Sequence, residues 1–361
     1  MRRGFALVLV LVFLTASCII EAKPVSGGSA VENSWVEKAS IPTARGYLRT
    51  AVVNEKIYAI GGNIFGSNEE YDPATDTWTT KASMPDPQPQ FAIAVCQGKI
   101  YCIGGMPAGS LGGSGANQVY DPETDSWENK ASMPTGRFGL QAQVVDDRIY
   151  LIGGRKLLGY NLGFEELNVT EVYDPVSDTW STKSSIPNSA GYVSVVVDDK
   201  IFVIGAVTQI YDPKINTWSI GTAPIEKLVM GVNDESAATA ATTGEMAPKR
   251  IYVYDGSYLQ VYDPLKNSWT FGANPPINRQ YLSIAVVNDT LYFIGGFTDH
   301  FNNIPGYFKE YNTNEQYIPF GYGTIEQQTF PTATVATISV VTALGIAIAA
   351  GLIFYFKKCH H

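Results

Sequence analysis

The stretch Ile57-Tyr58-Ala59-Ile60-Gly61-Gly62, continued by Tyr71-Asp72-Pro73 and Trp78, decides the fold of this chain. An apolar strand ends on two glycines, a turn rich in Asp and Pro follows, and a tryptophan leads to a proline. Copies of this pattern lie about 40 to 50 residues apart, a period typical of an array of small supersecondary units. The aromatic–proline pairs are Trp35/Pro42, Trp78/Pro85, Trp127/Pro134, Trp180/Pro187, Trp218/Pro224, Trp269/Pro275 and, weakly, Tyr317/Pro319.

One unit, residues 45–78, contains the pattern of four short strands. Thr50–Asn54 is β-branched and apolar, Glu55-Lys56 form a tight turn, and Ile57–Ile60 is a second, fully apolar strand. A third strand ends at Tyr71, and a fourth runs from Thr77 through Lys81. Four antiparallel strands repeated in this way predict a propeller blade.

The residues that recur in the units have structural explanations. Proline presets φ in the Tyr-Asp-Pro turn, where an Asp side chain bonds the backbone two residues on. Glycine tolerates positive φ where a strand stops among crowded backbones, and Tyr and Trp offer apolar area for packing between sheets. The turns begin at Tyr71, Tyr120, Tyr173, Tyr211 and Tyr262, with Tyr311-Asn312-Thr313 as a worn copy; the structural aspartates are Asp72, Asp121, Asp174, Asp212 and Asp263; the glycines are Gly61, Gly62, Gly104, Gly105, Gly153, Gly154, Gly295 and Gly296.

Diglycine, Tyr-Asp-Pro and Trp in this fixed order resemble the kelch repeat, over about residues 33–320. The resemblance implies an all-β fold, a six-bladed kelch β-propeller. The units begin near Arg45, Phe91, Phe138, Tyr192, Leu228 and Tyr281. Blade four departs from the pattern with Gly205-Ala206 and blade five with Asp255-Gly256, while blade six lacks the tryptophan and the proline after Tyr311.

Six units but seven aromatic–proline strands leave one strand over. We expect Ser34–Ala39 to be the outer strand of blade six, so that an N-terminal strand closes the ring and removes its open edge. Residues 317–320 then begin a linker that leaves the ring. The opposite assignment places Tyr317 inside the ring and packs Trp35 outside it.

The two ends of the chain indicate export and membrane anchoring. Residues 1–22 combine Arg2-Arg3 with an apolar run, the pattern of a signal peptide cleaved near Ser17 or after Ala22; an uncleaved anchor is the alternative. Residues 335–356 are uncharged and long enough to span a bilayer, and Lys357-Lys358 place the tail in the cytoplasm. The predicted layout is a signal peptide at 1–22, a propeller outside the cell at 23–322, a linker at 323–334, a single transmembrane helix at 335–356 and a cytoplasmic tail at 357–361.

The part predicted to lie outside the cell is acidic. Without Arg2, Arg3, Lys357 and Lys358, 21 basic residues face 34 acidic ones, a formal charge of −13. This balance argues against nucleic acid or anionic lipid as partners. Cys96 and Cys102 lie on a predicted hairpin over 94–103, on opposite faces, so that no disulfide is expected between them.

We expect ligand binding on the rim that carries the loops after the paired glycines and the loops that lead from each Trp strand into the next blade. In kelch proteins this rim usually carries binding. Converging guanidinium groups with aromatic neighbours suit an acidic sugar or another carboxylate. The alternative is that these arginines brace neighbouring loops. The candidate ligand-binding residues are Arg45, Tyr47, Phe91, Arg137, Phe138, Arg279 and Tyr281.

Catalytic and metal chemistry have little support in the sequence. The acids on the same rim, Glu69-Glu70, Glu165-Glu166, Asp255 and Asp299, are dispersed, although a carboxylate pair can serve glycoside hydrolysis. Outside the tail the one histidine is His300, too few for a copper site like that of galactose oxidase. We therefore predict no catalytic residues, no metal and no cofactor.

Two further features concern the surface. Asn168-Val-Thr170 and Asn288-Asp-Thr290 are glycosylation sequons that we expect in exposed positions. An insertion rich in Ala and Thr, Asp234–Pro248, is expected in the turn between the first two strands of blade five, as a mobile segment.

These features predict a cell-surface binding or adhesion module that presents a kelch propeller to an extracellular protein or glycan. The alternative is a carbohydrate-active enzyme, because exported sialate mutarotases are also kelch rings of similar size. An intracellular scaffold is disfavoured because both ends of the chain resemble membrane-directed segments.

Overall fold

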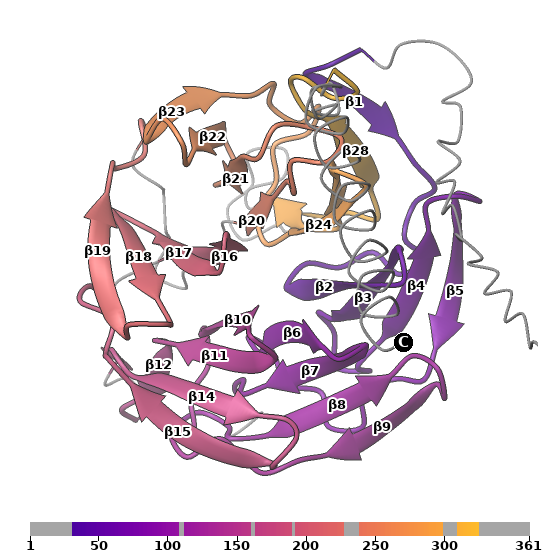
Figure 1. Cartoon of the computed structure of the whole chain (residues 1–361). Coiled ribbons are helices and arrows are strands. Elements are labelled where there is room, and N and C mark those ends of the chain that lie inside the picture. The colour runs from indigo at the N-terminus through magenta and orange to yellow at the C-terminus, as the bar shows by residue number, and fades with distance from the viewer. Residues whose placement is uncertain are drawn as a thin grey trace, which may run out of the picture. The chain divides into compact units, whose positions relative to one another are not determined.

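Six four-stranded antiparallel sheets surround a central channel (Figure 1). The computed structural model describes residues 31–107, 112–159, 163–189, 192–226, 238–298 and 309–324. The described residues contain strands and no α-helix. Consecutive blades follow one another around the ring, as the colour gradient of Figure 1 shows. The predicted all-β, six-bladed propeller is confirmed.

Each blade is built from strands that run in order from the channel to the outside. Blade one consists of β2 Leu48–Val53, β3 Lys56–Gly61, β4 Asn68–Asp72 and β5 Thr77–Lys81. Blade two consists of β6 Ala92–Cys96, β7 Lys99–Ile103, β8 Asn117–Asp121 and β9 Ser126–Asn129. Blade three consists of β10 Gln141–Val145, β11 Arg148–Ile152, β14 Thr170–Asp174 and β15 Thr179–Lys183.

The second half of the ring repeats this order. Blade four consists of β16 Val193–Val197, β17 Lys200–Ile204, β18 Thr208–Asp212 and β19 Thr217–Gly221. Blade five consists of β20 Ala238–Ala241, β21 Ile251–Tyr254, β22 Leu259–Asp263 and β23 Ser268–Phe271. Blade six consists of β24 Ser283–Val287, β25 Thr290–Ile294, β28 Asn314–Ile318 and β1 Ser34–Glu37. Two small hairpins lie beside the ring, β12 Arg155–Leu157 with β13 Phe164–Glu166, and β26 Phe297–Thr298 with β27 Lys309–Glu310.

Local turn chemistry explains why the strands stop where they do. Asn54 and Glu55 both have positive φ, the requirement of a two-residue type I′ hairpin turn, and so this turn lies one residue earlier than predicted. Gly61 and Gly62 also have positive φ, and a Cβ on Gly62 would lie 2.4 Å from the carbonyl oxygen of Gly46. In the Tyr-Asp-Pro turn, Asp72 Oδ1 accepts from the Ala74 N–H at 2.9 Å. The predicted roles of the glycines and of this aspartate are confirmed.

The aromatic residues of the repeat fasten each blade to the preceding one. Trp78 Nε1 donates to the Ala39 carbonyl at 2.7 Å. Asp76 Oδ1 accepts from the Tyr71 hydroxyl at 2.6 Å and from the Ala39 N–H at 2.8 Å. Tyr71 and Trp78 pack between the sheets, as predicted. The repeat pattern did not indicate the role of Asp76. The equivalent trios of the other blades are Tyr120/Trp127/Asp125, Tyr173/Trp180/Asp178, Tyr211/Trp218/Asn216, Tyr262/Trp269/Asn267 and Tyr317/Trp35/Asn33.

Blade six is assembled from both ends of the described chain. β1 pairs antiparallel with β28, and Trp35 lies opposite Tyr317. Because Tyr317 also pairs with Leu291 of β25, residues 317 and 318 belong to the sheet, and the prediction that a linker begins at Tyr317 is wrong. The alternative was right to place Tyr317 inside the ring. It was wrong to pack Trp35 outside it, because β1 pairs with β28. The tyrosine that matches Tyr71 of blade one is therefore Tyr317 and not Tyr311. The segment after Gly296 is longer than in the other blades, so the expected spacing pointed to Tyr311.

The first strand of blade five lies where the sequence predicted an insertion. β20 occupies residues 238–241, inside the segment expected to be a mobile turn. Alanine has low strand propensity, which hid this strand, but its small side chain suits a crowded inner position. The connection that follows is anchored, because the Asp289 carboxylate accepts from the backbone N–H groups of Thr243, Glu245, Met246 and Ala247. Residues 227–237 lie outside the described chain.

The structure also bears on the predictions about the cysteines, the glycosylation sequons and the ends of the chain. Cys96 pairs with Lys99 and Cys102 with Ile93, as predicted. The two thiols form no disulfide with each other, and both are buried. Asn168 and Asn288 are both exposed. Among the described residues no helix has the length and apolarity that a membrane span requires. The predicted signal peptide at 1–22 and transmembrane helix at 335–356 lie outside those residues.

Candidate functional site

The three arginines predicted to contact a ligand are buried inside the blades. Arg45, Arg137 and Arg279 have exposed fractions of 1%, 0% and 1%. Arg279 donates from Nε to Gly295 O at 2.7 Å, from Nη2 to Phe293 O at 3.2 Å, and from Nη1 to Glu315 at 2.7 Å. Arg45 pairs in the same way with Glu69, and Arg137 with Glu171. Desolvation lowers the pKa of the Arg137 guanidinium, although Glu171 opposes the shift.

Blades without this arginine carry glutamine in place of the glutamate. Gln118 Oε1 accepts from the Asp86 N–H at 3.1 Å, and its Nε2 donates to Asp86 O at 2.8 Å. Gln209 and Gln260 make the same pair of bonds with Asn188 and Glu226. The loop into the next blade is thus held either by a buried ion pair or by two neutral hydrogen bonds. This exchange favours the bracing role of the arginines over ligand contact.

Two of the aromatic candidates pack inside the blades, and the other two contact each other at the rim. Phe91 and Phe138 have exposed fractions of 1% and 2%, and they belong to the hydrophobic core. Tyr47 and Tyr281 meet at the boundary between blades one and six, with ring centroids 4.3 Å apart. Phe297, which was not among the predicted site residues, stacks on Tyr281 with ring centroids 4.5 Å apart and an interplanar angle of 5°. Of the seven candidates, the structure brings Tyr47 and Tyr281 into contact at the predicted rim.

These two tyrosines have an unusual backbone conformation. Tyr47 and Tyr281 both have a φ of 56°, in the left-handed region that bulky side chains rarely adopt. Gly139 occupies the same place in blade three with a φ of 62°. The Tyr47 N–H donates to Tyr281 O at 2.9 Å, which ties the two strained positions together. Strain of this kind costs about 1 to 3 kcal/mol and concentrates at functional sites.

The acidic residues of the rim are engaged in ion pairs or turns. Glu69 pairs with Arg45, Glu165 with Lys156 and Glu166 with Arg155. Asp255 Oδ1 accepts from the N–H groups of Ser257 and Tyr258. Within the described residues no group of three or more His, Cys, Asp or Glu is arranged to hold a metal ion. Asp299 and His300 lie outside the described residues.

One loop of the rim presents two apolar side chains to solvent. Ile64 and Phe65, in the loop after Gly62, are 83% and 74% exposed. Asn63 Oδ1 accepts from the Phe65 N–H at 3.1 Å and the Ser67 N–H at 3.2 Å, and its amide donates to Ser67 Oγ at 2.9 Å. Gly66 O accepts from the Met84 N–H at 2.8 Å. The loop is therefore fixed by its own side chain and by the neighbouring strand.

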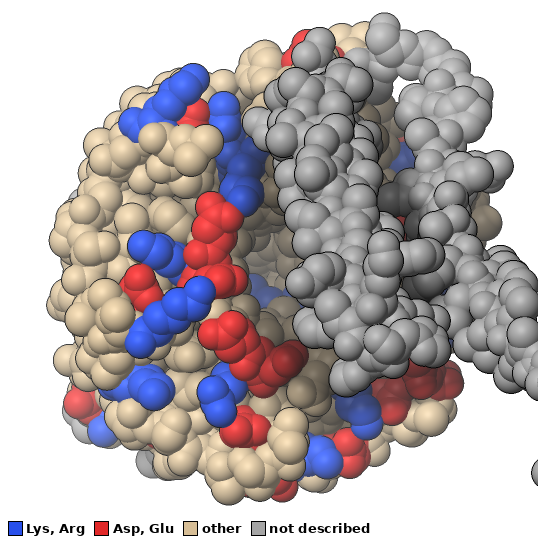
Figure 2. Space-filling view, in the orientation of Figure 1, with Lys and Arg blue, Asp and Glu red and all other residues tan. Residues whose placement is uncertain are grey.

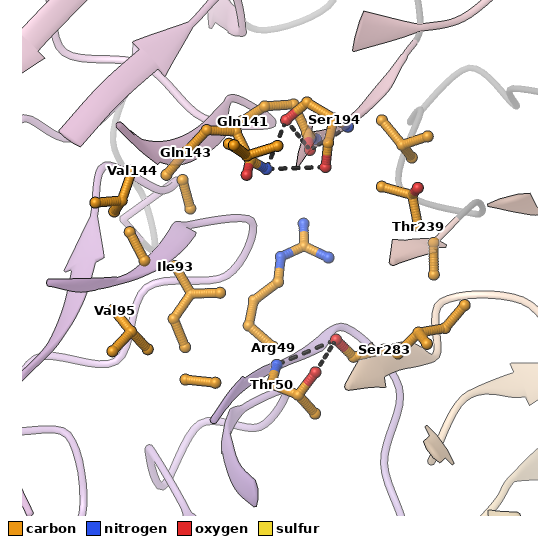
Figure 3. Close-up of a pocket in the computed structure, with 18 of the residues that line it drawn as sticks. Arg49, Thr50, Ile93, Val95, Gln141, Gln143, Val144, Ser194, Thr239 and Ser283 are labelled. Atoms are coloured by element: carbon orange, nitrogen blue, oxygen red, sulfur yellow. Dashed lines mark hydrogen bonds between the residues drawn. The ribbon is translucent and has the colours of Figure 1, made fainter. Parts of the chain in front are cut away.

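The central channel contains a cavity of about 390 Å³ lined by the six inner strands. Among its described lining residues, Arg49 is the one charged side chain. Its Nε donates to Phe91 O at 3.1 Å. Figure 3 shows its guanidinium pointing across the open space toward Gln143 and Ser194. Arg49 was not among the predicted site residues, because it lies inside β2 and not beside the repeated prolines.

Acidic and basic side chains alternate on the face of the ring shown in Figure 2 and do not gather by sign. Among the described residues, Lys214 pairs with Asp199 and Arg250 with Asp263. Exposed pairs of this kind contribute little to stability. No single-sign patch on the visible part of this face marks it for a highly charged partner.

The match to known proteins agrees with this architecture. The Kelch motif is matched at residues 44–85, 89–134 and 136–187. The chain carries kelch motifs on a six-bladed propeller. These matches cover blades one to three, and blades four to six share the Tyr, Trp and Asx contacts of those three blades.

One protein is similar to the chain in sequence, and one solved structure is similar to it in fold. The F-box/kelch-repeat protein At1g22040 of Arabidopsis thaliana is 37% identical over 70 residues, which cover 17% of this chain and 14% of that protein. The chain therefore matches about one seventh of the length of this relative. The solved structure of YjhT has a TM-score of 0.60 at 17% identity, covering 76% of this chain and 95% of its own. At that identity the likeness shows the fold alone.

Proposed function

We propose that this protein is a cell-surface binding module that uses one rim of its kelch propeller to recognise a protein partner. The rim is the one that carries the loops after the paired glycines and the loops leading into each inner strand. A propeller with kelch motifs suits the binding of a protein or another ligand. The observation that carries the proposal is the loop from Asn63 to Ser67, which holds Ile64 and Phe65 out into solvent.

The geometry of this loop suits a contact with a protein pocket. Large apolar side chains that insert into a desolvated pocket dominate many protein interfaces. The bonds of Asn63 hold the loop in one conformation, so little ordering entropy is lost on binding. No charged residue occurs from Gly61 through Asn68, although the chain as a whole has a formal charge of −9. The complementary partner surface is therefore an apolar pocket.

Display at the cell surface is the second part of the proposal. It is supported by the signal-peptide pattern of residues 1–22, by the uncharged stretch 335–356 and by Lys357-Lys358 after it. In this arrangement a single helix holds the propeller outside the cell and leaves a short tail in the cytoplasm. Extracellular protein is the partner class we favour, and a glycan is the other class to be tested.

The test displays the full chain on cells and measures adhesion to arrayed secreted proteins and glycans. We expect adhesion to a protein that falls at least about tenfold when Ile64 and Phe65 are both changed to Ala. Val176 and Leu265 provide matched controls, because they are 81% and 86% exposed but lie in Tyr-Asp-Pro turns on the opposite rim. Adhesion unaffected by the Ile64 and Phe65 changes would contradict the proposal that this rim binds the partner. Failure of an antibody to reach the propeller on intact cells would contradict the proposal that the propeller lies outside the cell.

A carbohydrate-active enzyme is the second candidate, and one residue favours it. Burial raises the pKa of Glu166, although Arg155 opposes the shift at 2.7 Å. A carboxyl group with a raised pKa is suited to act as a general acid. Anomer interconversion of sialic acid, followed by NMR and lost in a Glu166→Gln variant, would support this function over the binding module. An interconversion rate that is equal with and without the protein would exclude this enzymatic function.

A further inference from the structure

Blades one, two and three each carry a pair of basic side chains on one face. The first member follows the inner hairpin turn, at the start of the second strand, and the second member stands at the end of the outer strand. In blades four, five and six one member is replaced, by Gly221, Gly272 and Thr290. The complete pairs are Lys56/Lys81, Lys99/Lys130 and Arg148/Lys183.

In blade one a glutamate of the same blade lies between the two lysines. Glu70 Oε2 is 3.1 Å from Lys81 Nζ, and Glu70 Oε1 is 3.6 Å from Lys56 Nζ. The Tyr58 hydroxyl donates to Glu70 Oε2 at 2.6 Å. Burial alone would raise the pKa of Glu70, but the hydrogen bonds from Tyr58 and Lys81 outweigh burial and hold it below the ordinary value. This arrangement therefore stabilises an ionised carboxylate.

Blade two places a carboxylate between its lysines from a different strand. Glu128 belongs to the outer strand β9, whereas Glu70 belongs to the third strand β4. Glu128 Oε2 is 3.0 Å from Lys130 Nζ, and Glu128 Oε1 is 3.5 Å from Lys99 Nζ. The feature that the two blades share is therefore a carboxylate between two cations, whichever strand supplies it.

Blade three keeps the two cations but has no glutamate between them. In the strand register Val172 corresponds to Glu70, and Ser181 corresponds to Glu128. Within the part of the chain that the structure describes, no carboxylate forms an ion pair with Lys183. Blade three therefore has the positive side of the arrangement without the negative side.

A cavity of about 430 Å³ lies on this face of blade three. Arg148, Tyr150, Val172 and Lys183 line it, together with Pro213 from blade four. Tyr150 stands where blade one has the tyrosine that donates to the glutamate, because both pair with the corresponding residue of the third strand. The cavity is thus lined by the same three kinds of donor that surround the carboxylate in blade one.

Two carboxylates of the chain also line the cavity, and both have interactions of their own. Asp174 Oδ1 accepts from the Val176 N–H at 3.0 Å in the Tyr-Asp-Pro turn. Asp146 lies toward blade four, where the pKa of Lys214 is raised by its hydrogen bond to Asp199 and, to a smaller extent, by the charge of Asp146. These acids stand at the end of the cavity away from the outer-strand lysine, which leaves that lysine for an external anion.

We propose that the cavity on blade three binds a small aliphatic carboxylate. The ligand's carboxylate takes the place that Glu70 has in blade one. It accepts a hydrogen bond from the Tyr150 hydroxyl and forms charge-assisted hydrogen bonds with Lys183 and Arg148. The aliphatic part lies against Val172, where its burial adds binding energy in proportion to the area removed from water. The site does not involve the loop after Gly62, so it does not rest on the proposed function.

The test titrates the purified full chain with propionate and follows binding by saturation-transfer NMR at fixed ionic strength, in a buffer without carboxylates. Propionate reproduces the side chain of glutamate, and propionamide has the same shape without the charge. We expect saturable binding of propionate, at least about tenfold tighter than that of propionamide. Equal binding of the two probes would overturn recognition of the carboxylate. Absence of saturable propionate binding at millimolar concentrations would overturn the site.

Variants of the outer strands locate the binding on blade three. Lys183→Gln should weaken propionate about tenfold to hundredfold, the loss that corresponds to a charge-assisted hydrogen bond. Ser181→Glu copies Glu128 of blade two, supplies the carboxylate from within the chain and should abolish propionate binding. Ser219→Glu is the matched control, because Ser219 is exposed at the same position of blade four, which has Gly221 in place of the lysine. Propionate binding retained in the Ser181 variant, or lost equally in the Ser219 variant, would overturn the proposal even if Lys183→Gln fails to fold.

Discussion

Arg279 Nη1 lies 2.7 Å from Glu315 Oε2, and both side chains are buried where the loop from blade five enters blade six. The same partnership occurs in blades one and three, and a glutamine bonded to the loop backbone replaces it in the other three. The arginine and the glutamate therefore act as one structural unit. The loops of the rim are held rigidly, and this rigidity is what positions Tyr47, Tyr281 and the mouth of the channel.

This relationship predicts strong coupling between Arg279 and Glu315. Arg279→Gln alone leaves the Glu315 carboxylate buried without its partner, which should lower the free energy of unfolding by about 3 to 5 kcal/mol. Blade two has Gln88 at the position of the arginine and Gln118 at that of the glutamate. The double variant Arg279→Gln/Glu315→Gln copies this arrangement and should recover at least half of that loss. Urea denaturation followed by tryptophan fluorescence measures both. Additive losses in the double variant would show that the two residues do not act as a unit.

A second prediction concerns Asn33, which completes the fastening of blade six. Its Oδ1 accepts from the Tyr317 hydroxyl and the Ala273 N–H, both at 2.7 Å, as Asp76 does in blade one. Asn33→Asp should leave stability nearly unchanged, whereas Asn33→Gly, which keeps the positive φ but removes both bonds, should cost about 1 to 3 kcal/mol. Differential scanning calorimetry of the purified variants gives the comparison. Equal melting temperatures for the Gly and Asp variants would contradict the fastening.

The sequence predicted what depends on the repeat and missed what depends on contacts between distant residues. Diglycine, Tyr-Asp-Pro and Trp specify local turns and packing, so the blades were recognisable. The partner of Arg45 is Glu69, and the repeat contained a usable sign of this, because glutamate stands two residues before the turn tyrosine only in blades with the arginine. Arg49 had no such sign. Its position facing the channel follows from closing six blades into a ring.

The third prediction follows from the Asp289 carboxylate and its dependence on pH. Burial alone would raise the pKa of Asp289, but the backbone N–H groups of Thr243, Ala247 and Met246 outweigh burial and hold it below the ordinary value. A lowered pKa means that this stabilisation is present above the unfolded-state pKa of about 3.9 and is lost as the pH falls through the folded-state value. Asp289→Asn should therefore lower stability at pH 7 by about 1 to 3 kcal/mol.

The pH series provides the control for Asp289. The difference between wild type and Asp289→Asn should shrink as the pH falls below about 4, because the wild-type carboxyl then becomes protonated. Urea denaturation at several pH values, with Asp198→Asn as an exposed control in another inner turn, measures the change. A difference that stays constant down to the acid limit of folding would contradict the role of the ionised carboxylate.

The last prediction uses the left-handed backbone of Tyr47 to separate strain from ring contacts. Both Tyr47→Ala and Tyr47→Gly remove the ring, which lies 4.3 Å from that of Tyr281 and 5.3 Å from that of Phe297. Only glycine adopts a φ of 56° without steric cost, so the Gly variant should be more stable than the Ala variant by about 1 kcal/mol, the reverse of the usual order. Gly139, in the same place in blade three, gives the matched control, because Gly139→Ala should cost a similar amount. Thermal unfolding of the three variants measures these differences, and an Ala variant as stable as the Gly variant would show that the backbone at Tyr47 relaxes and stores no strain for the rim.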